Sequence, residues 1–457
     1  MTKDTLWLAP LIKQLKGLSG QKFPHGFSCR VACSVDPVEM THWLSIQNIP
    51  LKSFWRNRKG NLSIAGLGQA WEYRLHHRND IAPCFRQISQ LLKNNSTDLS
   101  PLQCLGFIAF SDQQQCTWES FGYGHFFLPA IELRKNTWGY QLACHLFYDN
   151  PQQWQTMINK RVEQLSHLDW STTSKKHHSC ALTPAGYIPD ETQWQHLMTQ
   201  SQQAFRDKQF RKVVLSRESR FSFDGTLSPW EILRRWHEAN PYSYTYAFQE
   251  TPGHVFFGCS PESLFHRRGL SITTEALAGT ISRGTDRYTD QEKADYLLSD
   301  PKNITENRLV LDDIKQRLNP VCTHLKADKT HSLLKLKNLQ HLRYLIRGRL
   351  IPDVKDEDLI RILHPTPAIG GLPREQAMAF IHREEPYARG LYAGICGIVG
   401  LNDTELNVSI RCARLAPGKL SLYSGAGIIP ASRSLDEWEE LDNKISTIRH
   451  ILHTICT

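Results

Sequence analysis

A lysine stands where burial would penalise its charge. Lys212 precedes the apolar run Val213-Val214-Leu215, which predicts a buried strand. Lysine is rarely fully buried. Its ammonium either reaches water from the strand end or serves as a base, because partial burial moves the pKa of a lysine towards neutrality. These few residues alone leave both interpretations open.

Glutamates on two predicted helices form a second set. Val310 and Ile314 follow Glu306 at i+4 and i+8, so this glutamate lies on the apolar stripe of its helix. In the last helix of the sequence, three charged residues share one face: Glu437, Glu440 and Lys444. An exposed Glu–Lys pair would explain the last helix alone. Two helices offering carboxylate oxygens to Mg²⁺ would explain both sets.

Loops in the second half of the chain could hold an anion. Residues 275–284, 364–375 and 423–432 are rich in glycine, and apolar segments flank each of them. Glycine lets the backbone approach a ligand and exposes N–H donors. One such loop would be read as an ordinary turn, but three with basic residues nearby favour an anion site. Glu262 follows a predicted strand and a proline, a common position for an active-site residue.

The elements that must position these residues are mostly strands. Apolar runs at 105–110, 126–133 and 140–147 predict strands before a polar stretch at 169–190, which we interpret as a surface linker. It separates an N-terminal α+β part, 1–168, from a catalytic region, 191–457, within one large unit. Strands outnumber crossover helices, which predicts an α+β fold with largely antiparallel sheets.

Composition excludes several classes of protein. The chain has 457 residues, a formal net charge of +9, 40% hydrophobic and 22% charged residues, which is ordinary for a globular protein. No apolar run approaches the ~20 residues that a membrane helix needs. Lysine and arginine are scattered, which argues against nucleic-acid binding. The 12 cysteines include no C-x-x-C, and with no signal-peptide pattern we expect a cytoplasmic protein with free thiols.

Several stretches together resemble one family, the chorismate-utilising enzymes. They are "KVVLSR", "FFGCSPESL", "TEALAGTISRG", "HPTPAIGGLPR", "RGLYAGICG", "VSIRCAR", "YSGAGI" and "EWEELDNK", in matching order over 191–450. "LGFIAFS" and "FFLPAIEL" in the N-terminal third resemble the isochorismate synthases of the menaquinone type. The resemblance implies two stacked, mainly antiparallel sheets with helices outside and the site between them.

The resemblance implies roles for individual residues. Members of the family that use water rather than an amine have the pattern Lys212 with Ala278, in which Lys212 is the general base and Glu262 the general acid. Glu306 and Glu440 match the glutamates that bind Mg²⁺, and Glu437 matches a partner acting through water. The substrate-binding positions implied are Ala278, Gly279, Thr280, Ala368, Arg411, Tyr423, Gly425, Ala426, Gly427 and Lys444. Cys412 and Ile369 depart from the usual serine and valine without affecting this chemistry.

The implied reaction converts chorismate to isochorismate with Mg²⁺, by adding water at C2 and losing the C4 hydroxyl, for menaquinone or siderophore synthesis. A salicylate synthase, which then eliminates pyruvate, is the alternative. Ala276 favours the former, because salicylate synthases usually have proline there. A catalytically dead binding protein would have lost the acid, base or metal glutamates. We expect a monomer with no glutaminase subunit.

Overall fold

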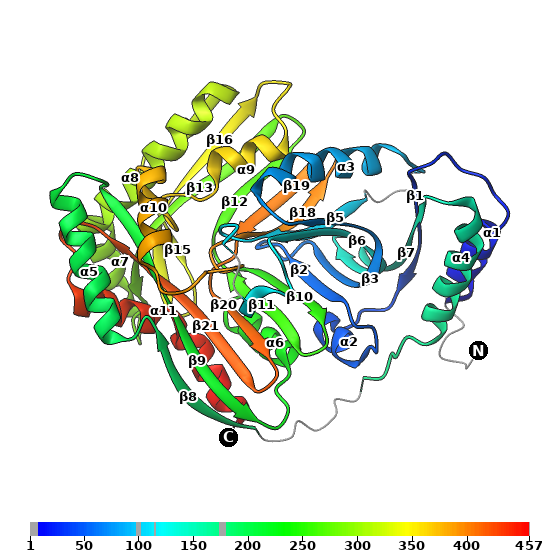
Figure 1. Ribbon diagram of the computed structural model, residues 1–457, viewed down its shortest axis with the longest axis horizontal. Helices are drawn as coiled ribbons and strands as arrows, with labels where there is room; N and C mark the ends of the chain where they lie inside the picture. The colour runs from blue at the N-terminus through cyan, green and yellow to red at the C-terminus, as the bar shows by residue number, and fades with distance from the viewer. Residues whose placement is uncertain (1–7, 97–101, 114–115, 173–179, 457) are drawn as a thin grey trace.

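Antiparallel strands dominate the computed structural model, which describes residues 8–96, 102–113, 116–172 and 180–456 (Figure 1). Successive hydrogen-bonded neighbours form one long row. In spatial order this first row contains β1 (Phe27–Val35), β7 (Gly139–Tyr148), β6 (Gly124–Asn136), β3 (Ser63–Leu75), β2 (Lys52–Arg56), β10 (Tyr244–Thr251), β11 (His254–Ser260), β20 (Cys412–Ala416), β21 (Lys419–Ile428), β9 (Lys212–Asp224) and β8 (Ala181–Ile188).

A second row leaves the first at β6, whose N-terminal half pairs with β5 while its C-terminal half pairs with β7. It continues through β5 (Gln103–Ile108), β18 (Ile395–Gly400), β19 (Asp403–Val408), β12 (Ser263–Arg268), β13 (Ser271–Ser282) and β16 (Leu339–Leu350), which also pairs with β14 (Cys322–Ala327) and β15 (Ser332–Lys335). The short strands β17 (Gly371–Leu372) and β4 (Asn95–Ser96) pair with β9 and β1. The predicted α+β fold with mainly antiparallel sheets is confirmed, and its two layers are joined into one hydrogen-bonded network.

Alternating side chains build two cores. On β10, Tyr244, Tyr246 and Phe248 lie in a core that also contains residues of the second row, such as Phe107. Ala247, between them in sequence, belongs to the other core, which contains side chains of helices α1 (Ala9–Gly17), α2 (Met40–Ile46), α4 (Pro151–Ser166), α6 (Pro229–Ala239) and α11 (Ser434–Cys456). This period of two is what a strand covered on both faces requires.

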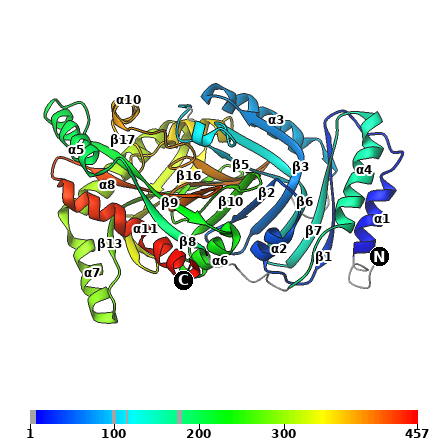
Figure 2. The same cartoon turned by 60° about the horizontal axis from the view of Figure 1, so that its bottom comes forward.

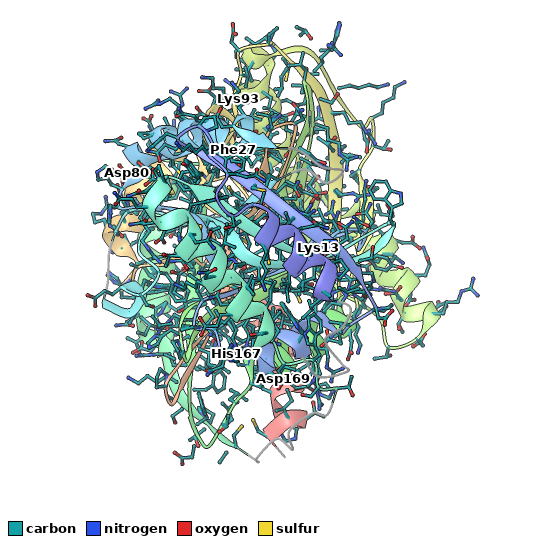
Figure 3. The ribbon with its side chains drawn as sticks, turned by 90° about the vertical axis from the view of Figure 1, so that its right-hand side faces the viewer. Lys13, Phe27, Asp80, Lys93, His167 and Asp169 are labelled. Carbon is teal, nitrogen blue, oxygen red and sulfur yellow. The ribbon has the colours of Figure 1, made fainter. Side chains whose placement is uncertain are left out.

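Helices cover the outside of both layers. Residues of α3 (Ile81–Lys93), α8 (Pro301–Leu318), α9 (Asp356–Leu363) and α10 (Arg374–Glu384) contribute to the core that Phe107 occupies. The remaining helices, α5 (Glu191–Arg206) and α7 (Arg287–Ser299), lie at the side of the molecule opposite α1 and α4 (Figure 2). At that other end, α1, which carries Lys13, lies beside α4 (Figure 3); α1 packs on β1, which begins at Phe27, and α4 packs on β7. Within the described residues, no helix is both long and apolar enough to cross a membrane.

The stretch that we predicted to be a linker is partly a strand. Residues 181–188 form β8, the edge strand beside β9, and their side chains are mostly exposed. Pro184 and Gly186 within the strand, and the polar residues that precede it, conceal it in the sequence, because both features are typical of a loop; its register with β9 shifts between Pro184 and Tyr187. Residues 173–179 lie outside the described residues. The pairs β2–β10 and β5–β18 link the chain on either side of this stretch into one unit.

Candidate active site

The chain passes between the two rows at two adjoining places. Pro261 and Glu262 connect β11 of the first row to β12 of the second, and residues 409–411 return from β19 to β20. The backbone N–H of Val408 donates to the Glu262 carbonyl (3.1 Å), and that of Cys259 donates to the Arg411 carbonyl (3.0 Å). The two crossovers are therefore held against each other, and they place the acidic side chain of Glu262 and the basic side chain of Arg411 where the rows meet.

A cavity at this junction brings the predicted site residues together. It is lined by Glu262, Ala278, Gly279, Thr280, Glu306, Ala368, Arg411, Tyr423, Gly425, Gly427, Glu437, Glu440 and Lys444. Lys212 reaches the cavity through its contact with Glu306. Ala426 is the exception: it lies on the alternate face of β21, with its side chain in the core between the layers.

Lys212 does not reach water. It is the first residue of β9, its exposed fraction is 0%, and its Nζ donates to Glu306 Oε1 at 2.8 Å. The snorkelling interpretation is therefore wrong, because the side chain points towards α8. Gly427 on the neighbouring strand makes room for the pair. A Cβ at Gly427 would lie 2.6 Å from Glu306 Oε1 and 3.1 Å from Lys212 Cε.

Glu262 is held in the neutral form near neutral pH. Its exposed fraction is 4%, and Thr366 Oγ1 donates to its Oε1 at 3.4 Å. Burial is the main cause that raises the pKa of Glu262 to about 8, and the negative charge of Glu275 adds to it, although Lys212 and Lys444 oppose the rise. A carboxyl group in this state can donate a proton at physiological pH.

Each of the three glutamates expected to bind metal contacts a lysine. The distances are 2.8 Å for Lys212–Glu306, 3.2 Å for Lys302–Glu437 and 2.5 Å for Lys444–Glu440. Burial and the neighbouring Glu440 raise the pKa of Glu437. Burial also acts against the charge of Glu440, but Lys444 outweighs it and lowers the pKa of that carboxyl. The lysines thus neutralise a set of otherwise repelling carboxylates.

The chemical type of the carboxylate oxygens in the cavity suits a hard cation. Glu306 on α8 and both Glu437 and Glu440 on α11 line the same cavity, and carboxylate oxygens are the ligands that Mg²⁺ prefers. As the described side chains stand, no three His, Cys, Asp or Glu residues converge closely enough to form a metal site. A cation at this place would exchange with the lysine ammonium groups.

Basic groups occupy another wall of the cavity. Lys444 Nζ donates to the Gly425 carbonyl (2.7 Å), and Arg411 Nη1 donates to the Lys444 carbonyl (2.7 Å). Burial, with Arg411 and Lys444 nearby, keeps the pKa of His341 well below its usual value, so this ring is neutral and its Nδ1 pairs with Thr280 Oγ1 (2.8 Å). This wall suits a carboxylate ligand.

The sequence analysis missed several lining residues: Lys302, Asn303, His341 and Tyr392. Lys302 could have been found, because it lies one helical turn before Glu306. His341 lies on β16, where nothing in the local sequence indicates a site, and only the pairing of distant strands brings it here. Tyr392 lies in "RGLYAGICG", which carried the family resemblance, but no role was assigned to it; its ring stacks on Tyr423 with centroids 5.5 Å apart.

Comparisons with known proteins identify the family of this chain. The family model described as "Chorismate binding enzyme" matches residues 14–453. Isochorismate synthase MenF of Escherichia coli (strain K12) is 30% identical over 426 residues, 91% of each chain, and isochorismate synthase 2, chloroplastic, of Arabidopsis thaliana is 30% identical over 84% of this chain and 69% of its own length.

A solved structure of MenF, the menaquinone-specific isochorismate synthase from Escherichia coli, superimposes with a TM-score of 0.86 at 28% identity and covers 98% of this chain and 99% of that one. The fold, the coverage and the family match lead to the same conclusion. The chain is an enzyme of the chorismate-converting type and belongs to the family of chorismate-binding enzymes.

Proposed function

We propose that this chain is an isochorismate synthase, which converts chorismate to isochorismate. The observation that carries the proposal is a buried lysine, Lys212, that contacts Glu306 on the wall of a cavity which is also lined by Glu262, a carboxyl group whose pKa is raised to about 8. A reaction that takes a proton from water and gives one to a leaving hydroxyl needs such a base and such an acid. The similarity to MenF over 91% of both chains supports the menaquinone type of enzyme.

In the proposed mechanism, neutral Lys212 removes a proton from the water that adds at C2 of chorismate. Glu262 donates its proton to the C4 hydroxyl, which leaves as water while the ring double bonds shift. The number of protons is conserved, because Lys212 gains one and Glu262 loses one. In the structure Lys212 Nζ is bonded to Glu306 Oε1, so this contact must open before the nitrogen can accept a proton from water.

Two kinds of group could bind the substrate carboxylates: basic side chains and backbone atoms. Arg411 and Lys444 supply positive charge on one wall, and the backbone at Gly279 and Gly425–Gly427 lies close enough for main-chain contacts. Gly279 has a φ of +78°, and a Cβ there would lie 3.1 Å from Asn303 Cβ. This left-handed conformation favours glycine and turns the backbone towards the ligand.

Mg²⁺ belongs to the proposal as a cofactor. Glu306 and Glu440 would hold it directly and Glu437 through water. When bound, it would neutralise charge on a substrate carboxylate and withdraw electrons from the ring. The two proton transfers are assigned to Lys212 and Glu262.

The test is incubation of the purified chain with chorismate, with and without Mg²⁺, and separation of the products by chromatography. Isochorismate is the expected product, and only in the presence of the cation. Salicylate with an equal amount of pyruvate would show the alternative, a salicylate synthase. Unchanged chorismate under all conditions would contradict both.

A further inference from the structure

Two residues outside the cavity, Arg58 and Glu275, bind the backbone on both sides of Glu262. Arg58 Nη1 donates to the carbonyl of Pro261 (2.7 Å), the residue before Glu262. The backbone N–H of Ser263, the residue after it, donates to Glu275 Oε1 (3.0 Å). Arg58 and Glu275 are themselves joined by a bidentate ion pair, with distances of 2.7 and 2.9 Å.

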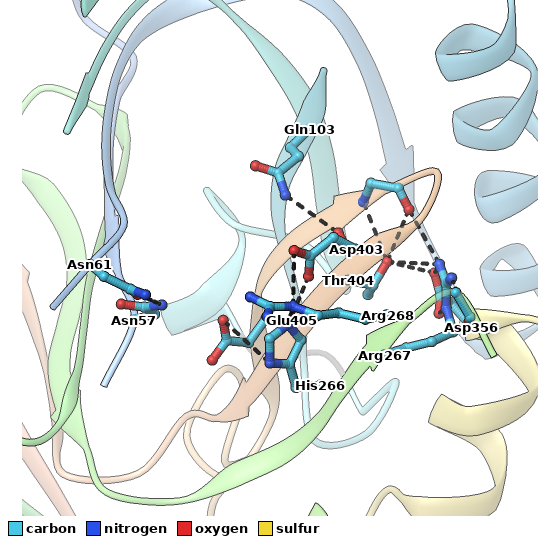
Figure 4. A network of polar contacts seen from close by, with 12 residues as sticks. Asn57, Asn61, Gln103, His266, Arg267, Arg268, Asp356, Asp403, Thr404 and Glu405 are labelled. Atoms are coloured by element: carbon cyan, nitrogen blue, oxygen red, sulfur yellow. Dashed lines mark hydrogen bonds and ion pairs between the residues drawn. The ribbon is translucent and has the colours of Figure 1, made fainter. Parts of the chain in front are cut away.

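The pair comes from parts of the chain that are far apart. Arg58 follows β2 in the N-terminal part, in a turn closed by the backbone bond from Asn57 to Leu62 (3.0 Å) and by the side-chain bond from Asn57 to Asn61 (2.7 Å; Figure 4). Glu275 lies on β13 with an exposed fraction of 2%. A bidentate pair of this kind is directional, so it fixes both the position and the orientation of the turn.

We propose that Arg58 and Glu275 are positioning residues for Glu262: Arg58 fixes the turn on which Glu262 stands, and the like charge of Glu275 favours the protonated, proton-donating form of Glu262. This inference rests on the proposed function and extends it, because it assigns part of the acid's reactivity to the N-terminal part of the chain.

The surroundings of Glu262 support the electrostatic half of the proposal. Glu275 on β13 is the acidic neighbour that raises the pKa of Glu262, whereas Lys212 on β9 and Lys444 on α11 lower it, as does the hydrogen bond from Thr366. Around Arg58, burial opposes the charge, but Glu275, Tyr244 and Glu405 favour it. The guanidinium of Arg58 therefore stays charged, and it holds Glu275 by two hydrogen bonds beside the turn that carries Glu262.

The first experiment measures kcat/KM for chorismate against pH in the wild type and in Glu275→Gln. Glu262 must be protonated to act, so activity falls as pH rises through its pKa. Removing the charge of Glu275 lowers that pKa, so the descending part of the profile of kcat/KM against pH should move to lower pH by about one unit. At the acidic end of the profile, kcat/KM should change by less than about threefold. If kcat/KM fell by the same factor at every pH and the descending part of the profile did not move, the proposal would be overturned.

Two variants separate charge from structure. Glu275→Asp keeps the charge, so the descending part of its pH profile should stay at the wild-type pH. Glu405→Gln removes another buried carboxylate, which accepts a hydrogen bond from Tyr244 Oη (2.8 Å) and lies near His266 (Figure 4). The descending part of its pH profile should also stay at the wild-type pH. A shift in either variant as large as that in Glu275→Gln would contradict a specific effect of Glu275.

Arg58 is tested by Arg58→Lys and Arg58→Met. Lysine keeps the charge but cannot bind both carboxylate oxygens and the Pro261 carbonyl in one plane. We expect kcat to fall in both variants, more in Arg58→Met, with a smaller change of KM. Wild-type kcat in a folded Arg58→Met would remove Arg58 from the proposal.

A second readout does not depend on turnover. The difference in melting temperature between proteins with and without Glu262→Gln, followed against pH, reports the pKa of Glu262. This difference should stop growing at a lower pH in the Glu275→Gln background than in the wild type. If the wild type does not convert chorismate, the proposed function fails, and this measurement still decides the effect of Glu275 on Glu262.

Discussion

The two side chains that we propose to transfer protons differ in how they can be tested, and Lys212 is the simpler. Lys212→Met keeps much of the buried volume and removes the amine. We expect turnover of chorismate to be lost, because the amine that accepts the proton of water is removed, while circular dichroism shows a native fold. Near-wild-type turnover by a correctly folded variant would contradict the role of Lys212.

Glu262→Gln should separate chemistry from binding. The amide keeps the size of the side chain but cannot deliver a carboxylic proton, so kcat should fall by roughly 10²–10⁴. Affinity for chorismate, measured by calorimetry, should change little, because Arg411 and Lys444 are untouched. A loss of affinity by orders of magnitude with kcat preserved would make Glu262 a binding residue instead.

The same variant should be more stable than the wild type at neutral pH. The folded state raises the pKa of Glu262 to about 8, so the folded protein holds a proton that the unfolded chain releases above its ordinary pKa of 4.5. This part of the stability is fully present below about pH 4.5 and is lost as pH rises to about 8. The advantage of Glu262→Gln in melting temperature should grow over that range.

Two helices bring the carboxylates together at the scale of elements. Glu306→Gln on α8 and Glu440→Gln on α11 should each weaken Mg²⁺ binding measured by calorimetry, because an amide is a poorer ligand than a carboxylate for a hard cation. Glu439→Gln is the matched control, since Glu439 is exposed on the same helix. Full activity in excess EDTA, or equal binding by all four proteins, would reject the metal site.

The strand β21 contributes space rather than a functional group. In Gly427→Ala the new Cβ would meet Glu306 and Lys212 at 2.6 and 3.1 Å, so the pair must separate or shift. We expect kcat to fall at least tenfold with the melting temperature within a few degrees of the wild type. Gly17→Ala is the control, because nothing lies within 4 Å of a Cβ there. Equal activity of the two variants would show that Gly427 is not needed for this spacing.

The whole molecule should fold as one cooperative unit. A chain cut between residues 172 and 180 still has β2 paired with β10, β5 with β18, and Trp55 Nε1 bonded to Asn407 Oδ1 at 3.0 Å. The two fragments, expressed together, should elute as one complex and melt in a single calorimetric transition. A fragment 1–172 that folds alone would contradict this prediction.

Much of this arrangement is predictable from the sequence, and what is not has a physical reason. Lys212, Glu262 and the glutamates of α8 and α11 stand in short segments whose local pattern is informative. Arg58 lies in no stretch that indicated a site, and Glu275, although it lies in "TEALAGTISRG", had no assigned role, because the contacts of both residues arise only where the two rows of strands meet. The strand β8 was also missed, since Pro184 and Gly186 within it, and the polar residues before it, resemble a loop.

The lysine–glutamate pairs imply reciprocal binding of metal and substrate. With one lysine for each of Glu306, Glu437 and Glu440, the cavity starts near charge balance. A divalent cation alone, or a dianion alone, would disturb that balance, whereas the two together restore it. Thermodynamic linkage then requires each to raise the affinity of the other by the same factor. We expect the enzyme to bind either one weakly and both tightly.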